Sequence, residues 1–183
     1  MTRKIFNAAA LAVAIAGQAA GALAMPVSNA YIQSSANEIR GQLGSYSRPT
    51  VYVDQSACGE GQASAMACGP YTISVGVGFL QQQESSYGNY VAKFILAHEW
   101  GHTIQFTRGI NRQPPMQELQ ADCVGGTFAK YAEINLRYPS FIENAVASAR
   151  DAADYAEHGT PSQRDYYSRY GYANGLNTCL NRI

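Results

Sequence analysis

The chain has 183 residues, with 13 basic and 13 acidic side chains and 46% hydrophobic residues. Neither sign of charge forms a run, so the sequence excludes a basic nucleic-acid surface and a polybasic membrane surface. Any binding must therefore come from a local site.

The first 24 residues have the form of an export signal. Arg3 and Lys4 precede an apolar run over residues 5–16, and small residues follow up to Ala24. An uncleaved anchor is the competing interpretation, but the run is too short to span a bilayer. We expect residues 1–24 to be a signal peptide. Residues 25–183 would then form one exported domain, periplasmic or extracellular, without stable membrane insertion.

Residues 28–44 predict an amphipathic helix, because Ser28 can cap it, apolar residues recur at helical spacing and Gly44 ends the pattern. A short strand is expected at 51–53. Four cysteines follow along the mature chain, which favours disulfides in an exported protein. They are Cys58, Cys68, Cys123 and Cys179. Three pairings are possible, and the short span between the first two favours pairing them with each other and the last two together.

Residues 71–79 alternate between apolar odd positions and small even positions, as in a strand. The even positions include Ser74, Gly76 and Gly78. If this strand lies at the edge of the sheet, these small residues leave room for an extended substrate backbone to pair with it. We therefore expect it to be a substrate-binding edge strand.

The rest of the chain predicts mainly helices, over about 89–106, from 114 through 126, and from 139 to about 157. A last helix begins at a capping box, residues 160–163, with proline in the first turn. Strands come first and helices dominate afterwards. The expected fold is α+β, with a small N-terminal sheet packed on a mainly helical C-terminal part.

The stretch "AHEWGHTIQ", residues 97–105, carries the strongest chemical signal. His98 and His102 are one helical turn apart and can grip one metal ion. Glu99 is rotated by about 100° and would lie beside the open position of that metal. By chance the pattern is expected about 0.002 times in such a chain. It predicts a catalytic Zn²⁺ site with Glu99 as general base.

A catalytic zinc needs a third protein ligand and an open position for water. The pattern with a third histidine six residues after His102 fails, because residue 108 is arginine. Glu118, Asp122 and His158 are the remaining candidates. Glu118 and Asp122 share a helix face, which favours one as metal ligand and the other as support behind a ligand histidine. The alternative is that Glu118 and Asp122 form a solvent-exposed acidic helix face with no metal.

Three motifs in order, "AHEWGH", "ELQADC" and "HGTPSQR", resemble those of bacterial neutral zinc metallopeptidases of the YpfJ type, within the broader gluzincins. The resemblance covers roughly residues 50–183 and implies a zincin-like fold. It implies that His98, His102 and Glu118 bind zinc, that Glu99 is the general base, and that Asp122 supports a ligand. It also supports the disulfide pairing above.

His158 stands at the entrance of the last helix. An ordinary capping or turn histidine is one interpretation. Related gluzincins place a donor opposite the zinc, so we expect His158 to stabilise the oxyanion. Arg164 would then orient His158 or the chain end.

The sequence thus predicts an exported endopeptidase with one Zn²⁺ per chain and a protein or peptide substrate. A zinc hydrolase acting on cell-wall peptides uses the same chemistry. A catalytically inactive exported binding protein is the third possibility, which Glu99 disfavours because a structural site has no use for an acid there. The oligomeric state is not predicted.

Overall fold

A computed structural model describes residues 24–59 and 64–182. Its elements are α1 (Asn29–Leu43), β1 (Thr50–Val53), β2 (Ala65–Gly69), β3 (Thr72–Val75), α2 (Val77–Tyr87), α3 (Val91–Arg108), α4 (Met116–Asn135), α5 (Ile142–Asp151), α6 (Pro161–Asn174) and α7 (Leu176–Arg182). The predicted α+β class is confirmed: 61% of the described residues are helical, and the sheet is small. The expected signal peptide, residues 1–24, falls outside these ranges apart from Ala24.

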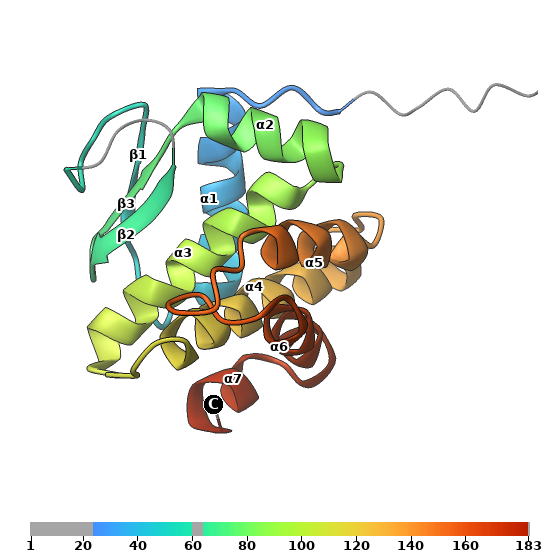
Figure 1. Cartoon of the computed structure of the whole chain (residues 1–183). Coiled ribbons are helices and arrows are strands. Elements are labelled where there is room, and N and C mark those ends of the chain that lie inside the picture. Colours follow the sequence, from blue (N-terminus) through green and yellow to red (C-terminus); the bar gives the residue numbers. More distant parts are fainter. Residues whose placement is uncertain (1–23, 60–63, 183) are drawn as a thin grey trace, which may run out of the picture.

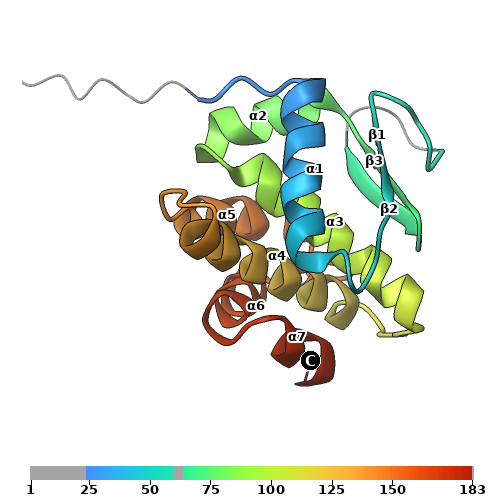
Figure 2. The ribbon, with the colours of Figure 1, turned by 180° about the vertical axis from the view of Figure 1, so that it is seen from behind.

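Helix α3 runs diagonally through the middle of the molecule, with the sheet on one side and α4 on the other (Figure 1). The first helix has the predicted cap, since the Ser28 side chain accepts a hydrogen bond from the Tyr31 amide. Its apolar stripe, including Ile32 and Leu43, is buried. Seen from behind, α1 lies beside the sheet (Figure 2), and it contacts β1, α3 and α4. Among the described helices, none combines the length and apolar character that crossing a bilayer requires.

The sheet has the order β1–β3–β2, with β1 parallel and β2 antiparallel to β3. The predicted edge strand is therefore the central strand, and it ends at Val75. Gly76 is the N-cap of α2, and Gly78 lies inside that helix. The prediction of a substrate edge at Ser74, Gly76 and Gly78 was wrong. The edge beside α3 is β2, for which no strand was predicted.

The small side chain of Ser74 has a structural explanation instead. Its hydroxyl donates to the Gln55 carbonyl and accepts from the Ala57 amide, so the loop after β1 covers this position. Small residues on a strand indicate close approach of another backbone. Here that backbone belongs to the chain itself.

Both predicted disulfides are present. Cys58–Cys68 joins the loop after β1 to strand β2, and Cys123–Cys179 joins α4 to α7. No cysteine of the described chain is free. These bonds tie the outer strand β2 and the last helix α7 covalently to earlier segments of the chain.

Glycines allow the helices that carry the candidate site to approach closely. A Cβ at Gly101 of α3 would lie 3.0 Å from the Ala121 Cα of α4, and one at Gly125 would lie 2.8 Å from the Phe94 ring. Gly126 faces α6, where a Cβ would overlap the Ser168 carbonyl. Side-chain bulk at any of these positions would push α4 away from its neighbours.

We predict that Gly126→Ala destabilises the protein by more than about 2 kcal/mol, because the overlap is with rigid backbone. Gly78→Ala is the matched control: Gly78 is exposed in α2, and nothing lies within 4 Å of its added Cβ. That substitution should stabilise by about 0.5–1 kcal/mol through helix propensity. Urea unfolding of both variants checks this. Equal stability of the two variants would contradict the packing argument.

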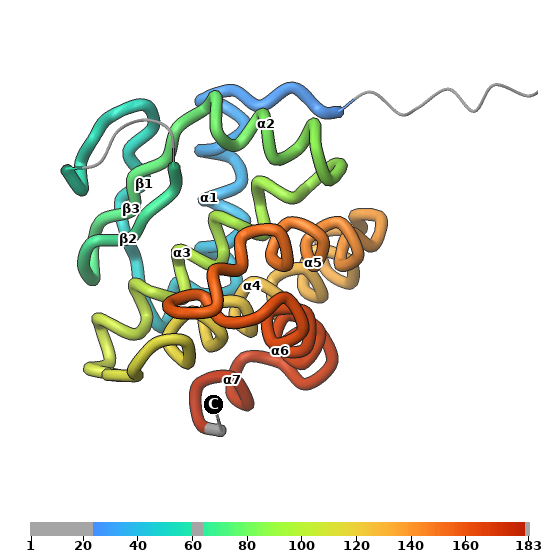
Figure 3. Tube along the Cα trace, in the orientation of Figure 1, coloured from blue at the N-terminus to red at the C-terminus, as the bar shows by residue number. Residues whose placement is uncertain are grey.

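The connection between α5 and α6 is longer than the sequence suggested. Helix α5 ends at Asp151 rather than near residue 157, and α6 begins at the predicted capping box of Thr160 and Gln163. In Figure 3 this connection, coloured orange, passes in front of α4 and turns back near α3. It carries His158 to the region of the two other histidines.

Candidate metal centre

Three side chains converge where α3 crosses the start of α4. The Nε2 atoms of His98 and His102 are 3.1 Å apart. Glu118 places Oε2 at 3.2 Å from the His98 Nε2 and Oε1 at 3.3 Å from the His102 Nε2. The ligand atoms of all three lie within 4.8 Å of one another, so the group could hold a metal ion.

The spacing of these donors fits a small divalent metal. Nitrogen and oxygen ligands lie about 2.0–2.1 Å from a tetrahedral zinc, which puts neighbouring donors about 3.3 Å apart. The observed separations are 3.1–3.3 Å. Two imidazoles and one carboxylate also suit other transition metals. The donor spacing is therefore compatible with a bound metal ion but does not select zinc.

Each imidazole is oriented by a hydrogen bond at its far nitrogen. The His98 Nδ1 lies 2.9 Å from Asp122 Oδ1, and the His102 Nδ1 lies 2.9 Å from Gln105 Oε1. An Nδ1–H donated to an oxygen leaves Nε2 with a free lone pair, which a metal requires. These hydrogen bonds orient both rings so that Nε2 points into the site.

Gln105 is a supporting residue that the sequence analysis did not assign. Its amide nitrogen donates to the Gln117 carbonyl at 2.7 Å and to Gln120 Oε1 at 3.1 Å. These bonds fix the amide oxygen toward His102. The signal in the sequence was its position, three residues after His102 on the inward face of the helix.

Asp122 is held by a buried arginine. Arg164 donates from Nε to Oδ2 and from Nη2 to Oδ1, both at 2.7 Å. Burial raises the pKa of Asp122, but the charge and hydrogen bonds of Arg164 outweigh it and lower the pKa below its usual range. The third donor atom, Nη1, reaches the Ala152 carbonyl at 3.2 Å. The expectation that Arg164 orients His158 was therefore wrong.

His158 is oriented by Asp154 instead. Its Nδ1 lies 2.7 Å from Asp154 Oδ2, and its Nε2 points toward the donor group, 3.8 Å from Glu118 Oε2. Asp154 Oδ1 also accepts the backbone N–H groups of Glu157 and His158. The backbone and side-chain hydrogen bonds from His158 hold the pKa of Asp154 below its usual range. Asp154 was not predicted, because the sequence indicated a helix up to about residue 157, whereas α5 ends at Asp151.

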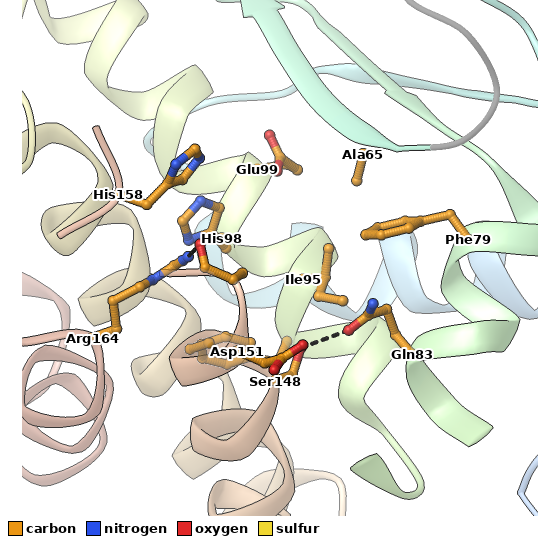
Figure 4. Close-up of a pocket in the computed structure, with 13 residues that line it drawn as sticks. Ala65, Phe79, Gln83, Ile95, His98, Glu99, Ser148, Asp151, His158 and Arg164 are labelled. Carbon is orange, nitrogen blue, oxygen red and sulfur yellow. Dashed lines mark hydrogen bonds between the residues drawn. The ribbon is translucent and has the colours of Figure 1, made fainter. Parts of the chain in front are cut away.

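Glu99 lies between two cavities that flank the donor group. One is about 280 Å³ and the other about 290 Å³, and Glu99, His98, His158 and Ala65 line both. Figure 4 shows the first cavity, with Glu99 and His158 at one end. A molecule bound at the metal would therefore find space on both sides of Glu99.

The protonation of the histidines depends on metal binding. Burial lowers the pKa of His98, but hydrogen bonds to Asp122 and Glu118 more than offset this and raise it to about 10. The pKa of His102 is also raised, despite burial, chiefly by its hydrogen bond to Glu118. Without metal, the His98 ring favours the protonated form at neutral pH.

We predict that zinc binding releases protons and strengthens as pH rises. The metal needs neutral imidazole, so at pH 7 at least one proton must leave His98 on binding. Between pH 7 and 9 the affinity should rise by about tenfold or more per pH unit, since the raised pKa of His98 lies above this window. Calorimetry in buffers of different ionisation enthalpy counts the protons. A pH-independent affinity would contradict this protonation scheme.

No protein-family model matches the chain, and searches of curated proteins and of solved structures find no match.

Proposed function

We propose that this protein is an exported, zinc-dependent endopeptidase with a zincin-like fold, related to the neutral zinc metallopeptidases whose motifs it resembles. The observation that carries the proposal is the convergence of His98, His102 and Glu118 between two cavities, with Glu99 lining both. Two histidines and one glutamate form a known catalytic zinc ligand set. Space on both sides suits a polypeptide that continues in both directions.

A bound zinc ion would supply Lewis acidity to a water molecule and to the substrate carbonyl. Glu99, beside the ligands but outside their set, accepts the proton of the attacking water. It then passes that proton to the leaving amide nitrogen. A His158 imidazolium, with Nδ1–H donated to Asp154, would donate its Nε2–H to the developing oxyanion. Asp122 and Gln105 keep the ligand imidazoles in place.

Strand β2 replaces β3 as the proposed substrate-binding edge. It pairs with β3 on one side only, within the described sheet. Its residues Ala65, Met66 and Ala67 line the cavity beside the metal donors. An extended peptide added to this edge would pass over Glu99.

The test is metal content and hydrolysis measured on the same mature protein. We expect about one zinc per chain and cleavage of casein that a chelator stops and zinc restores. Cleavage of cell-wall peptides but not casein would instead favour the cell-wall hydrolase. Zinc retention with no hydrolysis of either substrate would favour a binding protein and overturn the proposal.

A further inference from the structure

The cavity shown in Figure 4 has an apolar wall and a polar end. We name it the Asp151 cavity. Phe79 and Ile95 line its wall, and Gln83, Ser148 and Asp151 lie at the end away from Glu99 and His158. At about 280 Å³ it is small for a drug-sized ligand but large enough for one long side chain. An apolar stem with a polar tip would match this lining.

The polar end of the Asp151 cavity carries negative charge. Tyr87 donates to Asp151 Oδ2 at 2.5 Å and is the only hydrogen-bond partner of this carboxylate within residues 24–59 and 64–182. That hydrogen bond raises the pKa of Tyr87 to about 12, so the hydroxyl stays neutral. The neighbouring Arg150 pairs with Asp165 instead. The Asp151 charge is therefore left without a cation among the described residues.

Arg164, the arginine in the wall of the cavity, does not cancel this charge. Arg164 lines the cavity, but its guanidinium is bound to Asp122 through two hydrogen bonds. Its remaining contact is the Ala152 carbonyl. Arg164 is therefore neutralised by a partner outside the cavity.

The end of α5 adds to the negative potential. Ser148, Ala149 and Asp151 belong to the last turn of α5 and line the cavity together with the next residue, Ala152. The C-terminus of a helix carries partial negative charge and favours cations. The carboxylate and the helix end therefore favour the same kind of ligand.

The place where the Asp151 cavity meets β2 indicates which substrate residue would enter the cavity. The Asp151 cavity touches β2 only at Ala65, whereas the second cavity touches Ala65, Met66 and Ala67. A peptide antiparallel to β2 would run from the Ala67 side toward the Ala65 side. The Asp151 cavity would then receive the residue that follows the scissile bond.

We propose that the Asp151 cavity selects a lysine or arginine side chain immediately after the scissile bond. This rests on the proposed endopeptidase function and deepens it by naming the substrate class. The aliphatic stem lies along Ile95 and Phe79, and the cationic tip reaches Asp151 and the end of α5. An uncharged side chain of the same length makes the first contact but not the second.

The experiment compares peptides that differ at one position, carrying lysine, arginine, norleucine, leucine or glutamate. Norleucine keeps the stem of lysine and removes its charge. Cleavage sites are mapped by mass spectrometry, and kcat/KM is measured for the wild-type protein, Asp151→Asn and the control Glu133→Gln. Asparagine can still accept the Tyr87 hydrogen bond. Glu133 lies near the far end of α4, 15 residues after Glu118, or about 22 Å along the helix.

We expect cleavage before lysine or arginine to exceed cleavage before norleucine by about fivefold, the scale of a solvent-accessible charge pair. Asp151→Asn should remove this preference without changing cleavage before norleucine, and Glu133→Gln should keep it. Added salt should weaken it. Equal or better cleavage before leucine or norleucine would overturn the proposal while leaving the endopeptidase function intact.

A binding measurement separates the two proposals if no peptide is cleaved. The same labelled peptides are titrated into zinc-loaded Glu99→Gln protein, with and without Asp151→Asn, by fluorescence anisotropy. Tighter binding of the lysine peptide that Asp151→Asn removes would support the cavity's selectivity even without hydrolysis. Identical affinities for lysine and norleucine would refute it.

Discussion

Glu99→Gln should lower peptide hydrolysis about 10³-fold while zinc content stays near one per chain. Glutamine keeps the shape of the side chain but cannot accept the proton of the attacking water. Glu99 is not one of the three metal-donor residues, so replacing it leaves the metal ligands in place. Initial rates on a peptide substrate and elemental analysis of the same sample measure both effects.

Glu143→Gln is the matched control for this substitution. Glu143 is an acid of α5 that pairs with Arg169 on the surface, so its loss should leave hydrolysis unchanged. The general-base role fails if Glu99→Gln retains wild-type activity at full zinc occupancy. Loss of zinc along with activity would instead assign Glu99 to the metal.

Asp122→Asn should destabilise the metal-free protein by about 3–5 kcal/mol and weaken zinc binding by about 10- to 100-fold. Asp122 is fully buried, and its loss leaves the Arg164 charge buried without a counter-ion. The His98 ring also loses its anionic hydrogen-bond acceptor. Urea unfolding in the presence of chelator gives the free energy of unfolding, and competition with a chromophoric chelator gives the zinc affinity.

Two further variants test whether the Asp122–Arg164 ion pair causes the loss of stability. Asp122→Asn combined with Arg164→Met should recover part of the lost stability, because the second change removes the unpaired charge. It should not recover zinc affinity. Asp165→Asn, which disturbs only partly exposed ion pairs, should cost less than about 1 kcal/mol. If the double variant recovers no stability, the unpaired Arg164 charge does not account for the stability lost in Asp122→Asn.

The Asp122–Arg164 pair also predicts how the stability of the protein depends on pH. The pKa of Asp122 is depressed in the folded state. Its contribution to stability is therefore present above its unfolded pKa of about 3.9, and it is lost as pH falls through the lower folded value. Asp122→Asn should flatten this part of the acid-unfolding curve.

Much of the candidate site is determined by the sequence itself, because it depends on spacing within single helices. His98 and His102 share a face of α3 through the helical period, and Glu118 and Asp122 do so on α4. The cap of α1 and the capping box of α6 are likewise local hydrogen-bond patterns. Such features do not depend on which distant segment packs against the helix.

Tertiary structure alone decides the features that depend on long-range pairing. Alternation of apolar residues indicates a strand but not its place in a sheet, and β3 became central only when β2 paired on its other side. Arg164 was expected to orient His158 or the chain end, but helix packing brought Asp122 within its reach. The loop that carries Asp154 and His158 to the metal donors, and the Asp151 cavity beside them, exist because α5 ends at Asp151 and the chain then turns back near α3. Helical periodicity could not reveal these features, because each joins residues that are far apart in the chain.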